Sequence, residues 1–127
     1  MENLTFMLSG LAIGIIVFHT AIIAPTVFRT LAVDDAGSFL RTVFPKFFIL
    51  ISCISFINVS FALVYGLTSI AVIAGISTVL MVIAYCLIPM TNRSRDEGKE
   101  QRFKLLHSVS VLLTVSVLLM NLSVVFL

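Results

Sequence analysis

Hydrophobic side chains fill four long stretches of the chain, which cover about residues 5–28, 46–66, 68–90 and 105–127. A helix of roughly 20 apolar residues crosses about 30 Å of hydrocarbon, whereas strands of a membrane barrel alternate apolar and polar residues over about ten positions. The stretches here show no such alternation. Because a helix pairs its own backbone polar groups, as lipid requires, the pattern predicts an all-α integral membrane protein. We expect an up-down four-helix bundle that forms one domain over residues 1–127.

The first connection between these stretches contains an amphipathic segment of its own. Asp34 or Asp35 is suited to cap a helix, and apolar side chains recur over the following residues. We therefore expect a short interfacial helix over about residues 34–44, with Pro45 in the first turn of the second span. The second connection, YGLTS, is typical of a tight turn, and the third, TNRSRDEGKEQRFK, is expected to be a solvated loop.

Charge is scarce, and its position predicts how the bundle sits in a membrane. Hydrophobic residues make up 60% of the 127 residues and charged residues 11%, against roughly half and a quarter in soluble domains. The lipid bilayer is therefore the expected main partner, and no nucleic-acid partner is expected. All 8 lysine and arginine residues lie in or beside the first and third connections, and loops rich in these residues stay cytoplasmic. We expect both chain ends on the non-cytoplasmic side of a bacterial cytoplasmic membrane.

One titratable side chain, His19, is predicted to lie near the middle of the membrane, about 15 Å deeper than Arg29 at the inner edge of the first span. The other spans place polar side chains at comparable depth, which gives an expected intramembrane polar layer of His19, Ser55, Asn58, Thr78 and Thr114. A buried neutral imidazole needs one partner for its N–H and one for its lone pair, and Asn58 and Thr114 are the candidates. The layer is interpreted as interhelical hydrogen bonding, as ligand or cofactor contact, or as proton handling.

His107 joins His19 as a candidate cofactor-binding residue. It lies near the inner interface, about 10 Å from His19 in depth, and this offset does not suit a single metal ion. Zinc would need three or four clustered His or Cys ligands, so no metal site is predicted. A haem with tilted axial ligands spans such an offset and is the alternative cofactor. Pro25 removes the backbone hydrogen bond to the carbonyl of Ala21 and is expected to kink the first span.

Three segments, APTVFRTL, AGSFLRTVFPKFF and NRSRDEG…FKLLHSVSVLL, give the chain a resemblance to the transmembrane protein 205-like family of small four-helix membrane proteins. Family members look similar in an F-x-x-x-H-x-x-S pattern that is followed by an asparagine. Phe103, His107 and Ser110 match this pattern, whereas Thr114 stands at the asparagine position. The resemblance implies an integral membrane bundle and adds no particular chemistry.

A looser similarity runs to membrane proteins of the copper-resistance D type and to haem-dependent membrane protoporphyrinogen oxidases. His19, Pro25, Phe28 and Arg29 resemble the histidine and Pro-Phe-Arg cluster of their first helix, which implies haem. The favoured function is a non-enzymatic scaffold or accessory protein, or a bundle that holds a small ligand. The alternatives are a haem- or metal-binding protein that uses His19 and His107, and a small transporter that works as an oligomer. A homo-oligomer or a larger membrane complex is the expected protein assembly.

Overall fold

The computed structural model of the chain describes residues 2–127, and every element in that range is helical. The first span, Asn3–Thr30, is a continuous rod made of three parts, α1 (Asn3–Val17), the π-helical segment η1 (Phe18–Ile23) and α2 (Ala24–Thr30). The other elements follow in chain order as α3 (Val33–Val64), α4 (Thr68–Asp96), α5 (Glu100–Ser123) and the 3-10 turn η2 (Val124–Phe126). Each of the 4 spans is long and apolar enough to cross a membrane.

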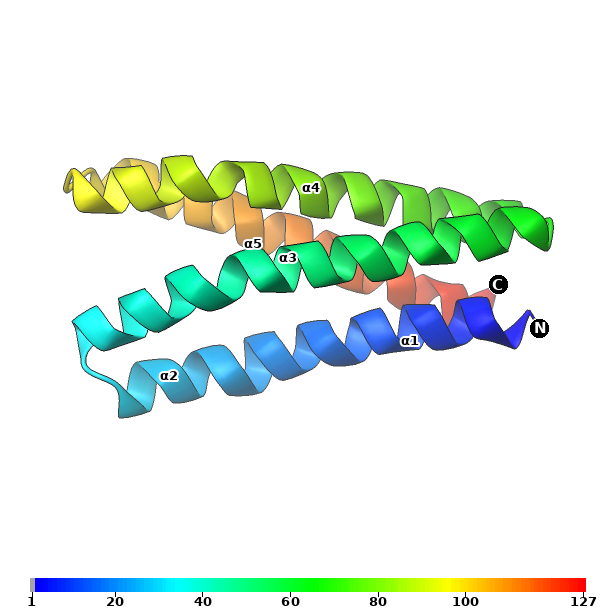
Figure 1. The fold of residues 1–127 in the computed structure, drawn as a ribbon, viewed down its shortest axis with the longest axis horizontal. Coiled ribbons are helices and arrows are strands. Elements are labelled where there is room, and N and C mark those ends of the chain that lie inside the picture. Colours follow the sequence, from blue (N-terminus) through cyan, green and yellow to red (C-terminus); the bar gives the residue numbers. More distant parts are fainter. Residues whose placement is uncertain (1) are drawn as a thin grey trace.

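The spans run alternately up and down (Figure 1). Both chain ends lie beside the turn between α3 and α4, at what we call the terminal end of the bundle. The connection from α2 to α3 and the connection from α4 to α5 lie at the opposite end, called the basic end because the lysine and arginine residues gather there. The predicted all-α four-helix bundle is therefore confirmed.

Both helical hairpins turn on a glycine in the left-handed backbone region. Gly66 and Gly98 each have a φ of 69°, a conformation that is costly for side chains with a Cβ. The amide that follows each glycine reaches back to the helix, from Leu67 to the carbonyl of Ala62 at 2.8 Å and from Lys99 to that of Ser94 at 2.9 Å. These bonds satisfy carbonyls that the helix end would leave unpaired, so the two turns stop α3 and α4 by the same device.

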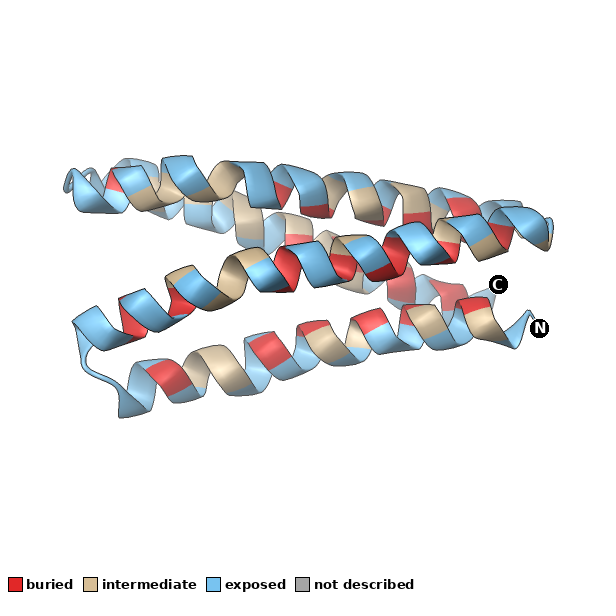
Figure 2. Ribbon diagram, viewed as in Figure 1, coloured by how far each residue is buried: buried red, intermediate tan, exposed pale blue. Residues whose placement is uncertain are grey.

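Burial follows one face of each helix, and Figure 2 shows the buried positions on the sides that face the other spans. Large apolar side chains cover the outward faces, among them Phe56 at 63% exposed and Leu119 at 60% exposed. A surface of this kind suits lipid rather than water. The main core joins all four spans and consists of Ala12, Ile16, Phe47, Phe48, Ile51, Ile54, Met81, Ala84 and Val117.

The expected separate helix over residues 34–44 is wrong, because this segment forms the first turns of α3. The helix begins at Val33 and continues through Pro45, which therefore lies inside it rather than in its first turn. The apolar side of the segment packs against the neighbouring span instead of the membrane surface, in a cluster of Val27, Ala36 and Leu40. This contact keeps the segment in line with the rest of α3.

The third connection is also more helical than expected. The helix α4 continues to Asp96 and α5 begins at Glu100, which leaves only Glu97–Lys99 as the turn. Arg93 and Glu97, one helical turn apart, form an ion pair at 2.7 Å that supports the extension of α4. The expected solvated loop is therefore replaced by two helix ends, and their side chains have defined positions.

Candidate functional site

A cavity of about 370 Å³ lies between the four spans, in the half of the bundle nearest the basic end. Each span contributes one stripe of residues three to four positions apart, the spacing of one helix face. The stripe on α5 runs from Phe103 to Leu118, which is about 22 Å along the helix axis. Most of the exposed lining residues lie on the first span and on α5, namely Thr20, Phe28, His107, Val111 and Val115, and Arg95 on α4 is exposed at the basic end. The cavity therefore opens between the first span and α5.

The backbone around His19 departs from the α-helical pattern. The amide of Ala24 bonds to the carbonyl of His19, five residues earlier, which is the pattern of a π-helix. This wider turn comes directly before Pro25. The backbone nitrogen of proline has no hydrogen to donate, and its ring crowds the preceding turn of the helix. The π-helical segment absorbs the proline within a continuous rod and brings His19 to the cavity wall. Turns of this kind occur often at functional sites.

His19 is 5% exposed and lies between two aromatic rings of α3. Its ring stacks on that of Phe47 with centroids 4.3 Å apart, and it meets the ring of Phe44 edge-on at 5.1 Å. The Nε2 atom is buried and has no hydrogen-bond partner among the described residues. An unpaired buried polar atom costs free energy, so His19 contributes little polar cohesion to the bundle and remains a candidate for ligand contact.

Carboxylates pair with three of the cations at the basic end. Arg41 on α3 donates two hydrogen bonds to Asp96 on α4, from Nη2 to Oδ1 at 2.5 Å and from Nη1 to Oδ2 at 3.2 Å. This two-pronged pair joins two helices that are far apart in sequence. Glu97 takes the other two cations, Arg93 at 2.7 Å and Lys99 at 2.9 Å.

The pairing of Glu97 changes its acidity. Its carboxylate accepts hydrogen bonds from Arg93 and from Lys99, and the charge of Lys99 adds to their effect. These contacts favour the ionised form and lower the pKa of Glu97 from 4.5 to about 2. The turn between α4 and α5 is therefore held by a carboxylate that stays charged well below neutral pH.

Arg95 differs from these cations, because its guanidinium forms no ion pair within residues 2–127. It lies over the ring of Phe103, 5.7 Å from the centroid, and Phe103 stacks on His107 with centroids 5.9 Å apart. Gly37 on α3 leaves room for it, since a Cβ at that position would lie 3.1 Å from the guanidinium nitrogen Nη2. All four residues line the cavity, so an unpaired cation stands at its basic end.

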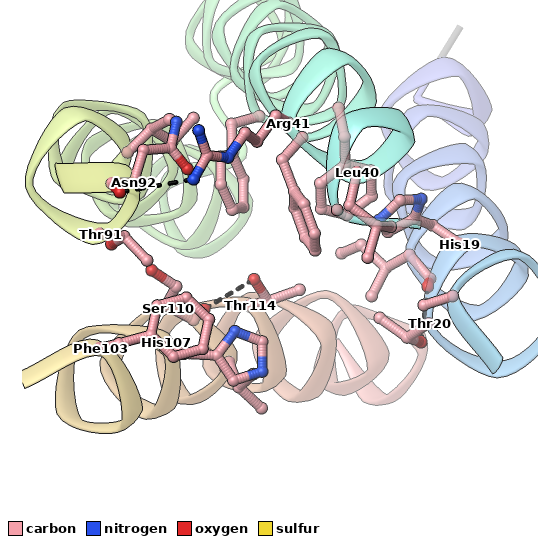
Figure 3. A pocket seen from close by; sticks show the side chains of 18 of the residues that line it. His19, Thr20, Leu40, Arg41, Thr91, Asn92, Phe103, His107, Ser110 and Thr114 are labelled. Carbon is pink, nitrogen blue, oxygen red and sulfur yellow. Dashed lines mark hydrogen bonds between the residues drawn. The ribbon is translucent and has the colours of Figure 1, made fainter. Parts of the chain in front are cut away.

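Of the predicted polar layer, only His19 and Thr114 line the cavity, and no hydrogen bond joins them. Thr114 donates instead to the carbonyl of Ser110 in its own helix, at 2.9 Å, as Figure 3 shows. Asn58 donates to the hydroxyl of Ser9 at 3.0 Å, nearer the terminal end. The two partners proposed for His19 are therefore engaged elsewhere.

Sequence reasoning missed a second polar contact between spans. Asn121 on α5 donates to the hydroxyl of Ser77 on α4 at 3.2 Å, and both residues are buried. The predicted residue on α4 was Thr78, which bonds only within its own helix at 2.9 Å. The hydroxyl of Ser55 is buried without a partner among residues 2–127. Arg41 and Arg95, which sequence reasoning assigned to the connections, also belong to the cavity wall.

The two histidines come from helices on different sides of the cavity, as Figure 3 shows for His19 and His107. The Nε2 atom of His19 is covered by its surroundings, so ligation of iron by this atom requires the ring or its neighbours to move. Within residues 2–127, no group of three or more His, Cys, Asp or Glu residues comes together to hold a metal ion. Haem binding by these histidines stays a prediction.

Residues 7–100 match a protein family that is described as a domain of unknown function, DUF4149. The match covers most of the chain and includes the first three spans, so the chain belongs to this family. No curated protein and no solved structure matches the chain.

Proposed function

We propose that this member of the DUF4149 family is a small membrane protein that binds a largely apolar ligand in the cavity between its spans. The cavity carries the proposal, because its volume of about 370 Å³ lies in the range of roughly 300–1,000 Å³ that ligand sites occupy. Its walls are mostly apolar and aromatic, with polar groups gathered near the basic end. A hydrophobic pocket with a few placed polar groups is the usual composition of a ligand site.

The segments that carry the resemblance to the transmembrane protein 205-like family support a role for this cavity. Each of the three contributes lining residues, Ala24 in the first, Leu40 and Phe44 in the second, and Phe103 and His107 in the third. If these segments served packing alone, they would not need to meet around one open space. The relationship to that family is itself part of this proposal.

We place the basic end on the cytoplasmic side and both chain ends on the opposite side, following the distribution of lysine and arginine. The cavity then lies in the inner half of the bilayer and opens to lipid between the first span and α5. A ligand dissolved in the inner leaflet reaches it without crossing water. A tag that carries a cysteine is added to either chain end and labelled with a thiol reagent that does not cross the membrane. A tag that is labelled only from the cytoplasmic side contradicts this orientation.

Photolabelling tests ligand binding in a bilayer. The purified protein is reconstituted in phosphatidylcholine nanodiscs and exposed to a neutral fatty alcohol that carries a photoreactive diazirine. We expect saturable labelling of peptides that contain Thr20 and Val115, above a background that rises linearly on lipid-facing residues elsewhere. Labelling that rises linearly at every apolar residue, with no saturable part, refutes ligand binding.

A matched pair of variants identifies the cavity as the place of binding. Ser110 and Ser116 are both half-buried serines of α5, and only Ser110 lines the cavity. Ser110→Phe fills the space and should abolish the saturable labelling, whereas Ser116→Phe should leave it unchanged. The absorption spectrum of the same sample tests the alternative, since a Soret band that disappears in His19→Ala replaces this proposal with haem binding.

A further inference from the structure

We infer that the ligand is a single-chain lipid with an anionic headgroup, and that the headgroup binds Arg95 at the basic end of the cavity. The inference rests on the proposed function and names the ligand class of the same site. It follows from the charges at the basic end, from the way Arg95 is held, and from the shape of the cavity.

The charges at the basic end are unevenly paired. Arg41 is paired with Asp96, and both Arg93 and Lys99 are paired with Glu97. Arg95 lines the cavity and forms no ion pair of its own among residues 2–127, and Asp96, whose carboxylate its charge also reaches, is already bonded to Arg41. A guanidinium at the edge of the lipid gains most from an anion that offers two acceptor oxygens, such as a phosphate or a carboxylate.

Neighbouring residues hold Arg95 in place. The ring of Phe103 lies under the guanidinium at 5.7 Å, and Gly37 leaves the space that it occupies. A cation stacked on an aromatic ring keeps its N–H donors free around its edge. The ring of Phe103 also stacks on His107, which adds an imidazole to the same end of the cavity. These side chains form a headgroup site before any ligand arrives.

The space behind Arg95 is elongated. The lining on α5 extends for about 22 Å from Phe103 toward the middle of the bundle. Its deeper part is lined mainly by apolar side chains, among them Ile16, Phe48 and Leu118, together with the polar residues His19, Thr20 and Thr114. A volume of about 370 Å³ spread over this length accepts one hydrocarbon chain rather than the two chains of an ordinary phospholipid. An anion with one chain fits both ends of the cavity.

Competition in the photolabelling assay tests the inference. Oleoyl lysophosphatidate and monoolein have the same chain, and only the former carries an anionic headgroup. We expect lysophosphatidate to displace the saturable label at a concentration about tenfold lower than monoolein, because charge-assisted hydrogen bonds are the stronger kind. Glycerol 3-phosphate, the headgroup without the chain, should not displace the label at that concentration.

Substitutions assign the headgroup to Arg95. Arg95→Gln should raise the half-displacing concentration of lysophosphatidate about tenfold and leave that of monoolein unchanged. Arg93→Gln is the matched control. It removes the same charge only two residues from Arg95, and the side chain of Arg93 does not line this cavity. Gly37→Ala is a second variant that alters no charge. It forces the guanidinium to move by a few tenths of an ångström and should weaken lysophosphatidate less than Arg95→Gln does, with monoolein unchanged.

The outcomes separate this inference from the proposed function. Saturable labelling that both lipids displace equally leaves ligand binding intact and overturns the anionic headgroup. Equal weakening by Arg93→Gln and Arg95→Gln overturns the role of Arg95, because the attraction then comes from the whole surface. If glycerol 3-phosphate displaces the label as well as lysophosphatidate does, the hydrocarbon chain is not part of what the site recognises, and the inference of a lipid ligand is overturned. The absence of saturable labelling refutes the proposed function itself.

Discussion

The terminal half and the basic half of the bundle are made from the same four spans, but they are closed in different ways. In the terminal half, short polar side chains reach across between helices, from Asn58 to Ser9 and from Asn121 to Ser77. In the basic half no hydrogen bond joins the first span to another span within residues 2–127, and the cavity lies there. The comparison shows that one half of a small bundle can provide cohesion while the other stays open.

Side-chain size contributes to the difference. Small buried residues such as Ala62, Ala71 and Ala74 lie on α3 and α4 in the terminal half, and small residues let helices approach closely. In the basic half, Phe44 and Phe47 stand between α3 and the first span and stack against His19. Large rings hold the helices apart, and the gap toward α5 is left as the cavity.

The largest expected effect comes from enlarging an alanine in each half. Ala74 is 1% exposed in the terminal half, so Ala74→Leu should lower the free energy of unfolding by about 1–3 kcal/mol through overpacking. Ala24 is half-buried on the cavity wall, and Ala24→Leu should change it by less than about 0.5 kcal/mol. Titration with SDS in mixed micelles measures both. Equal destabilisation would mean that the two halves are packed alike.

A smaller effect is expected from the polar contacts of the terminal half. A double-mutant cycle with Asn58→Ala and Ser9→Ala should give a coupling energy of about 0.6 kcal/mol and at most about 1.7 kcal/mol, the mean and the maximum for hydrogen bonds between membrane helices. The same cycle with Asn58→Ala and Thr114→Ala should give a value near zero, because Thr114 bonds only within α5. A coupling energy near zero in the first cycle would show that the hydrogen bond between Asn58 and Ser9 does not stabilise the terminal half.

The ion pair between Arg41 and Asp96 should contribute less. Both side chains are partly exposed, so Arg41→Gln should destabilise the protein by about 1 kcal/mol or less. Added salt should reduce the difference, since it screens exposed charges. Arg29→Gln is the control, because Arg29 is exposed and forms no ion pair among the described residues. Equal effects of the two substitutions would show that net charge, rather than the pair, is what matters.

The spans could be predicted from the sequence because their signal is a sum over about 20 residues, and an error at one position does not change it. The contacts between spans depend on helical phase, where one residue corresponds to about 100° of rotation. This is why Thr78 was expected in the polar layer, whereas its neighbour Ser77 faces Asn121. Position along the helix axis follows from counting residues, but the direction of the side chain was not available from one sequence.

The cavity was harder to predict than the spans. The segment before Pro45 looked like a separate interfacial helix, since proline is common in first turns, and this placed Arg41 outside the bundle. The sequence around Arg95 is polar and was interpreted as a loop. Only the continuation of α3 and α4 beyond the expected ends brings these two arginines into the wall of the cavity that Phe103 and His107 also line. His19 was identified from its chemistry, but its aromatic neighbours lie on another helix.

The smallest expected effect concerns the two glycine turns, which share one backbone device and differ in their charges. The turn at Gly98 carries Glu97, whose pKa is lowered to about 2 by hydrogen bonds from Arg93 and Lys99. A lowered folded-state pKa stabilises the protein above the ordinary carboxyl pKa, and this contribution is lost as the pH falls toward 2.

The difference in stability between the wild type and Glu97→Gln should therefore be constant from neutral pH to about pH 5 and should shrink as the pH is lowered further. Because the carboxylate is exposed, the difference should also shrink in high salt. Substitution of Ser69, an exposed residue beside the turn at Gly66, should show neither dependence. A difference that stays the same down to pH 2 would mean that the backbone device alone holds the basic turn, as it does the terminal one.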